Sequence, residues 1–287
     1  MRLMCAIILV VGLALPAQAA DDGRGWSFSG RFSGSSNSDG LVTKLDPALG
    51  YSFNNHWSTY TGVPFYFVNR SSSTTTTTSG SMSGVGNAFL GFRFGTKSDR
   101  LNYTSNLEFT APTGDKSRGF STGRVTADWT NIFSTKVSSL TPFGSVGIAN
   151  TVSDTAFFVR PFTSLGRVGH FEGGTTYDLL PAVRIGLSAY AVKGSGQQRI
   201  ISKIKRDTTT TSGSTTTSGS TTRGSANRVF DNQTETVADA SAVNDHGFST
   251  WFGVSPKPNV DFHAGYSRSV NYDFNTFFFG VGFHVGK

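Results

Sequence analysis

The sequence contains one pair of residues with the types and spacing that acid–base chemistry uses. Asp261 and His263 are two positions apart, and side chains two residues apart on a β-strand lie on the same face. A carboxylate beside an imidazole can move a proton in catalysis. In the wall of a barrel, however, such a pair more commonly forms a structural hydrogen bond. The pair is therefore a candidate site, and we do not predict catalysis from it.

Other patterns typical of enzymes and metal sites do not occur in the sequence. The five histidines lie in separate segments, and the chain has no H-E-x-x-H motif, no phosphate-binding loop, no serine elbow and no pair of cysteines. The spacing of histidines and carboxylates gives no zinc site. We therefore predict that the protein is not an enzyme and has neither a cofactor nor a bound metal.

Ten ionisable residues lie in predicted strands, each at a position that alternates with the apolar residues of its strand. They are Arg31, Lys44, Asp46, Arg93, Glu108, Arg124, Asp128, Arg184, Asp261 and His263. A lysine or arginine that faces lipid at the middle of a membrane costs about 2–4 kcal/mol. If the apolar positions face lipid, this cost explains the sorting. The parity predicts that the ten side chains line a polar lumen.

Charges of both signs in a lumen allow two interpretations. In the first, they form a selective pathway that orients a zwitterionic or polar solute. In the second, pairs of opposite charge fill the interior and hold the barrel closed. Barrels of about eight strands are filled by their own side chains and barrels of about sixteen leave a water channel, so an intermediate size is compatible with both.

Strands carry these residues, because nearly every segment outside the loops alternates between apolar and polar residues. In the segment 101–110 the odd positions are mostly apolar and the even positions are all polar, which is the strand period. Strands are predicted at 26–34, 41–53, 56–68, 84–96, 100–111, 122–134, 139–150, 157–170, 176–192, 246–255, 259–270 and 273–286. Their lengths suit tilted crossings of a bilayer. The sequence therefore predicts an all-β protein, a closed antiparallel up-and-down transmembrane β-barrel of about 12 strands.

The connections between the predicted strands differ in length at the two ends of the barrel. All the long ones follow odd-numbered strands, including the low-complexity loop 193–245, and every connection after an even-numbered strand is short. Bacterial barrels have short periplasmic turns and long extracellular loops. We therefore expect long extracellular loops and both chain ends in the periplasm. The basic, apolar stretch 199–206 either folds into the pore, lies on lipid headgroups or is plain loop.

The first twenty residues have the plan of a secretory signal peptide. Arg2 gives a positive start, residues 5–15 form an apolar run, and Ala17-Gln18-Ala19 resembles a cleavage site. The run is too short to cross a bilayer as a helix. We expect residues 1–20 to be removed, and residues 21–287, which contain no cysteine, to form a single domain in the outer membrane.

The net charge of +7 says little about partners. A basic protein can bind nucleic acid, but a secreted protein does not meet it. We expect outer-membrane lipid and small-molecule solutes as partners, and a homo-oligomer is compatible with the sequence. Aromatic residues near strand ends should mark the headgroup level. Those that fit are Trp26, Trp57, Phe171, Tyr177, Trp251 and Phe274.

The stretch 84–150 resembles a known family. It begins Gly84-Val85-Gly86-Asn87, which is similar to the glycine-paired entry strand of the outer-membrane proteins named for the meta-pathway of phenol degradation. The loop Pro112-Thr113-Gly114-Asp115 and the motifs Ser121-Thr122-Gly123 and Pro142-Phe143-Gly144 resemble the same family. The resemblance implies a barrel transporter or channel, in some members for hydrophobic or aromatic compounds. It implies no catalytic residues.

Together these features predict an outer-membrane channel for passive diffusion of small polar or aromatic solutes. The alternative is a closed barrel that displays its extracellular loops as an adhesive or structural surface. The two differ in whether the lumen is open.

Overall fold

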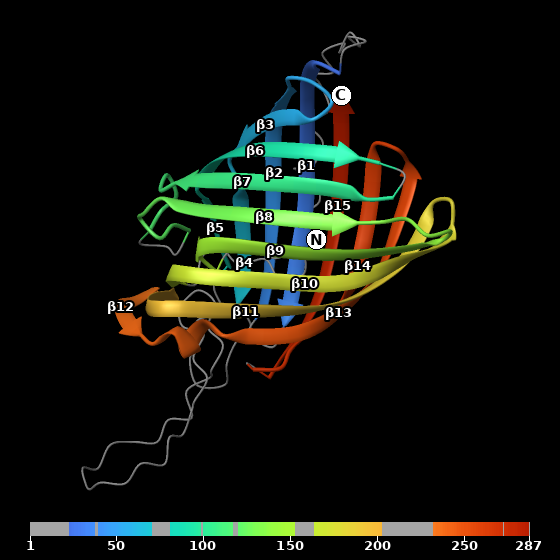
Figure 1. Ribbon diagram of the computed structural model, residues 1–287. Coiled ribbons are helices and arrows are strands. Elements are labelled where there is room, and N and C mark those ends of the chain that lie inside the picture. The colour runs from blue at the N-terminus through green and yellow to red at the C-terminus, as the bar shows by residue number, and fades with distance from the viewer. Residues whose placement is uncertain are drawn as a thin grey trace, which may run out of the picture.

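A computed structural model describes residues 23–37, 40–70, 81–98, 100–116, 120–152, 164–202, 232–271 and 273–286. The predicted signal peptide lies outside this part of the chain. Most of the described residues belong to β-strands, which form a closed antiparallel barrel (Figure 1). The predicted fold class is confirmed.

Fifteen strands and one short 3-10 helix make up the described fold. The strands are β1 (Gly25–Asn37), β2 (Gly40–Ser52), β3 (Trp57–Gly62), β4 (Phe65–Arg70), β5 (Ser81–Val85), β6 (Ala88–Lys97), β7 (Asn102–Ala111), β8 (Thr126–Ser134), β9 (Leu140–Thr151), β10 (Ser164–Leu180), β11 (Val183–Ser202), β12 (Asn232–Ala238), β13 (Asp245–Lys257), β14 (Val260–Ser269) and β15 (Phe274–Gly286). The helix η1 (Ala240–Val243) precedes β13. No helix among the described residues has the length and hydropathy needed to cross a membrane.

The strands occupy twelve places in the wall. β3 and β4 both pair with β2 and share one place, as do β5 and β6, while β12 pairs with β11 off the ring. The order round the wall is β1, β2, β3/β4, β5/β6, β7, β8, β9, β10, β11, β13, β14 and β15. The ring closes because β1 pairs with both β2 and β15. The predicted number of strands is confirmed.

The break between β3 and β4 lies next to the break between β5 and β6. Pro64 separates β3 from β4, and proline has no N–H to donate to a ladder. Its carbonyl oxygen accepts a hydrogen bond from the backbone N–H of Gly86 at 2.8 Å, at the gap between β5 and β6. The wall therefore stays connected across the interruption, and Asn87 beside it is buried.

The structure corrects two predicted strands. The segments predicted at 157–170 and 176–192 correspond to β10 and β11, which end later than predicted, at Leu180 and Ser202. Residues 157–163 lie outside the described part of the chain. Gly173 and Gly174 lie inside β10, in the gap 171–175 that separated the two predicted strands, and the chain turns at 181–182 instead. Glycine indicates a turn in sequence, but here each one lies within a paired strand.

The loop predicted at 193–245 is also shorter than expected. β11 continues to Ser202, and β12 and η1 lie within the predicted loop. The basic stretch 199–206 therefore begins as strand, and its remaining residues lie outside the described part of the chain.

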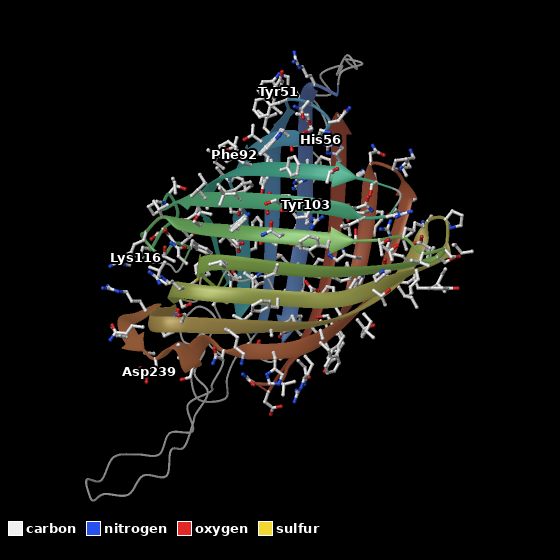
Figure 2. All side chains as sticks on the ribbon, viewed as in Figure 1. Tyr51, His56, Phe92, Tyr103, Lys116 and Asp239 are labelled. Carbon is white, nitrogen blue, oxygen red and sulfur yellow. The ribbon has the colours of Figure 1, made fainter. Side chains whose placement is uncertain are left out.

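The connections differ at the two ends of the barrel. One end, which we call the turn end, carries short connections at 53–56, 98–101, 135–139, 181–182 and 258–259. The opposite end is called the loop end. Figure 2 shows Tyr51 and His56 at the turn end, and Lys116 and Asp239 at the loop end.

The outer and inner faces of the wall differ in chemistry. Alternate apolar side chains are exposed on the outside, among them Phe28 and Phe32 of β1 and Phe248 and Phe252 of β13. Ser249, between the last two, is fully buried on the inside. Soluble proteins rarely expose a continuous apolar band, whereas barrels in membranes do.

Candidate solute pathway

The inner face carries the charged residues of β1 and β2. Arg31 pairs with Asp46 in the ladder, and their sequence neighbours Phe32 and Leu45 are exposed on the outside. Because successive side chains of a strand lie on opposite faces, Arg31 and Asp46 face the interior. Lys44 shares that face, and its Nζ lies 3.0 Å from Asp46 Oδ2.

A second group on the inner face joins β3, β6 and β7. The Tyr60 hydroxyl donates a hydrogen bond to Glu108 Oε2 at 2.8 Å and lies 3.0 Å from Asn106 Oδ1. The guanidinium carbon of Arg93 lies 5.3 Å from the centre of the Tyr60 ring, where the aromatic face attracts a cation. A Cβ atom at Gly91 would lie 2.1 Å from that ring. Glycine is therefore needed at position 91, because any side chain there would overlap the Tyr60 ring.

A third group joins β8 and β10. Asp128 Oδ1 lies 3.2 Å from His170 Nε2 and accepts a hydrogen bond from the Thr130 hydroxyl at 2.7 Å. The His170 ring lies over Gly147 of β9, where a Cβ atom would be 2.1 Å from the ring. As with Tyr60, a glycine on the neighbouring strand makes room for a large inward side chain.

Three more of the predicted residues lie on the inner face. Arg184 donates a hydrogen bond from Nη2 to Ser255 Oγ at 3.1 Å, close to the turn end. Asp261 and His263 lie opposite two glycines of β15. Their nearest oxygen and nitrogen atoms are 3.8 Å apart, which is too long for a hydrogen bond. This geometry gives no ground for assigning proton transfer to the pair.

Arg124 is placed differently from the prediction. It is exposed in the connection before β8, which begins at Thr126. The backbone N–H of Arg124 donates to Thr122 Oγ1 at 3.1 Å, and Gly123 has a φ of +71°. Local bonds from a threonine side chain compete with strand pairing, so the predicted strand started too early.

Three carboxylates and two cations of the inner face lie on different parts of the wall, although Asp46 lies beside the cations and Arg93 on β6 lies next to β7. With β1 counted as place one of the wall, β2 is place two, β7 and β8 are places five and six, and β10 is place eight. Lys44 on β2 and Glu172 on β10 are thus six places apart in a ring of twelve, on opposite walls. We call Glu108, Asp128 and Glu172 the negative arc, and Arg31 and Lys44 the positive arc.

Four large side chains of the inner face were not among the residues predicted for the lumen: Tyr60, His170, Glu172 and Trp251. The misplaced boundary of β10 hid His170 and Glu172. Trp251 was predicted at the headgroup level, but its ring fills the space over Gly186 on the inner face, 2.1 Å from where a Cβ atom would be. An inward ring opposite a glycine is the signal for such residues, and it becomes visible only when the pairing register is known.

The other aromatic residues predicted for the headgroup level lie on the outside where they are described. Trp26, Trp57, Phe171 and Tyr177 are 45–61% exposed. The side chain of Phe274 lies outside the described part of the structure.

We expect Tyr60→Phe to destabilise the barrel, because Glu108 would lose the donor of a partly buried hydrogen bond. Leaving a buried acceptor without its partner costs about 1–3 kcal/mol. Urea unfolding of the folded protein in detergent measures this loss. Tyr177→Phe on the outer face is the matched control, and equal stability of both variants would contradict the role given to Tyr60.

Comparisons with known proteins give similarity in fold. The sequence matches no family model, and a search of curated proteins finds no significant relative. The COG4313 outer membrane channel from Pseudomonas putida F1 has a TM-score of 0.53 at 12% identity, over 93% of this chain and 97% of that chain. The NanC porin has a TM-score of 0.49 at 8% identity, over 88% of this chain and 98% of that chain. At such identities the likeness extends to the fold alone: this chain has a barrel fold similar to that of the Pseudomonas channel.

Proposed function

We propose that the protein is an outer-membrane channel through which small polar solutes diffuse passively. The observation that supports the proposal is the uneven distribution of charge round the lumen: the negative arc lies on β7, β8 and β10 and the positive arc on β1 and β2, with Asp46 beside the positive arc and Arg93 beside Glu108. Side chains that merely filled the interior would pair across it. Here Lys44 pairs with Asp46 on its own strand, and Asp128 with His170 two places away.

The outer face supports the membrane location. Exposed phenylalanines recur on strands around the wall, including Phe92 on β6, Phe171 on β10 and Phe262 on β14. This band would face lipid. In the proposed orientation the loop end faces outward and the turn end the periplasm, where a signal peptide at 1–20 would deliver the chain. The pathway lies within one chain, so a homo-oligomer would carry one per subunit.

The separated charges would act on a zwitterionic solute. Its ammonium group would be drawn to the negative arc and its carboxylate to the positive arc, and the solute would cross the lumen in one orientation. Aromatic solutes would find apolar surface on Trp251 and Phe143, whose ring centres are 6.2 Å apart. Arg93, Arg184, Asp261 and His263 complete the proposed lining.

Planar-bilayer recording with the purified, folded protein tests the proposal. We expect discrete conductance steps that are ohmic at low voltage. A barrel that inserts, as shown by its resistance to protease, but gives no steps in any salt would overturn it.

A barrel that displays its loops is the second candidate, favoured by the continuation of β11 beyond its pairing with β13 into a pairing with β12. Ser202 and Asn232 are ladder partners, so residues 203–231 can be deleted and the two strands joined by a short turn. We expect the deletion variant to retain the conductance of the full chain. Loss of binding to cells or matrix, in a barrel that never conducts, would favour display instead.

A further inference from the structure

Phe120 lies inside the barrel although it belongs to a loop. Its side chain is fully buried, and its ring stacks on that of Tyr66 with centres 6.1 Å apart. Val42 and Val68 complete the cluster. These three wall residues face the interior, since Phe65 and Phe67, next to Tyr66, are exposed on the outside. The loop between β7 and β8 therefore extends into the lumen near the loop end.

The family-like motifs hold this loop in place. Asn87 Oδ1 accepts a hydrogen bond from the backbone N–H of Gly114 at 3.2 Å. Thr113 Oγ1 accepts one from the N–H of Ala88 at 2.8 Å and donates to the carbonyl of Gly86 at 3.3 Å. The glycine-rich interruption between β5 and β6 and the Pro-Thr-Gly-Asp loop thus bind each other directly.

Two glycines show how closely the loop fits. A Cβ atom at Gly114 would lie 2.4 Å from the carbonyl oxygen of Phe120 and 2.9 Å from that of Val85. A Cβ atom at Gly84 would lie 2.4 Å from the Phe120 ring. Among the described pairings, β5 pairs with β4 and its other edge has no strand beside it. The loop lies against the Val85 end of β5.

A second segment enters the lumen from the opposite wall. Val243 of η1 is buried against Val168 of β10 and Val192 of β11. Asn244 Oδ1 accepts a hydrogen bond from the N–H of Gly194 at 2.9 Å. β2 and β4 lie in places two and three of the wall, and β10 and β11 in places eight and nine. The two apolar clusters therefore lie on opposite sides of the loop end.

We propose that these two segments set the size limit of the channel. The inner loop, residues 112–116 and 120–125, and η1 narrow the mouth at the loop end. Phe120 is the specificity-determining residue, because it holds the inner loop against the wall. The charged arcs then act only on solutes that have already passed this mouth. The inference rests on the proposed channel function.

Phe120→Ser tests the role of the mouth. Removing the ring takes away the apolar contact that holds the inner loop inside, so we expect single-channel conductance to rise about twofold or more. Liposomes that contain Phe120→Ser should also admit larger sugars than liposomes that contain the unaltered protein. Phe53→Ser is the matched control, because Phe53 is exposed in a connection at the turn end, and it should change neither quantity.

A disulfide provides a test within a single folded protein. The position of a Cβ atom at Gly84 lies 3.1 Å from Phe120 Cγ, so the two Cβ atoms are at most about 4.6 Å apart, close to the range of disulfides. The chain beyond residue 20 has no cysteine to interfere. Oxidised Gly84→Cys/Phe120→Cys should keep the size limit of the unaltered protein, and reduction should raise it.

The outcomes separate this inference from the function on which it rests. The proposed role of the two segments would be overturned, but the channel left intact, by one result. That result is equal conductance and equal sugar exclusion in the unaltered protein, in Phe120→Ser and in both redox states of the double variant. Absence of conductance in every variant would overturn the channel itself.

Discussion

The ion preference of the proposed channel should shift towards anions when the negative arc is converted to positive charge. In Glu172→Lys and Asp128→Lys, a carboxylate of the inner wall becomes an ammonium group, so each substitution alters the lumen by two charges. Because permeating ions pass close to fixed charges in a narrow lumen whose walls have a low dielectric constant, the local ion concentration responds steeply to fixed charge. We expect the double variant to shift the cation-to-anion permeability ratio about tenfold towards anions. Reversal potentials under a salt gradient measure the ratio.

The matched control keeps the charge change but moves it outside the lumen. Asp273 lies between β14 and β15, its side chain is 84% exposed and it pairs with Arg268 on the outer face, so Asp273→Lys should leave the reversal potential nearly unchanged at high salt, where exposed charges are screened. An equal shift from Asp273→Lys would mean that the surface, and not the negative arc, controls permeation. Lys44→Glu should act in the direction opposite to the arc substitutions.

Gly91→Leu should prevent the barrel from folding with Tyr60 in its place. The leucine side chain would occupy the volume of the Tyr60 ring, since even a Cβ atom comes within 2.1 Å of it. Overpacking of a fitted interior costs about 1–3 kcal/mol or more, and here the Tyr60–Glu108 hydrogen bond is lost as well. We expect a large fall in the yield of the heat-modifiable, folded form on refolding into detergent.

Gly173→Leu is the control for this prediction. A Cβ atom at Gly173 has nothing within 4 Å, and the neighbouring positions of β10 place it on the outer face. An added leucine there should be tolerated and should extend the apolar band. If both variants refold equally well, the barrel does not depend on glycines that make room for large inward rings.

The fold could be predicted from the sequence because one rule applies throughout the barrel: apolar and polar side chains alternate along each strand and so lie on opposite faces of the wall. The parity of Glu108 and Asp128 could be read from neighbours such as Leu107 and Phe109 without knowledge of any partner. Nine of the ten residues predicted for the lumen lie in strands, and Arg124 does not. That error arose because Thr122 bonds the backbone locally, which period-two counting cannot detect.

The inner site was harder to predict because it depends on pairing between strands. Tyr60 needs Gly91, and His170 needs Gly147, and both relations follow from a register that the sequence does not display. Phe120 gives the clearest case, because nothing in its own segment distinguishes it from a lipid-facing residue. Its position inside follows from Asn87, between β5 and β6, whose side chain accepts a hydrogen bond from Gly114 of the loop.

The wall is of uneven height, with consequences for how molecules reach the mouth. β7 and β8 have 10 and 9 residues, whereas β10 and β11 have 17 and 20. A tilted strand crosses the hydrocarbon in about 9–11 residues, so the taller strands rise well clear of the bilayer on one side. Among the described strands, the rim is therefore higher at β10 and β11 than at β7 and β8. In the proposed orientation, molecules that diffuse along the cell surface would reach the entrance more easily at β7 and β8, beside the inner loop.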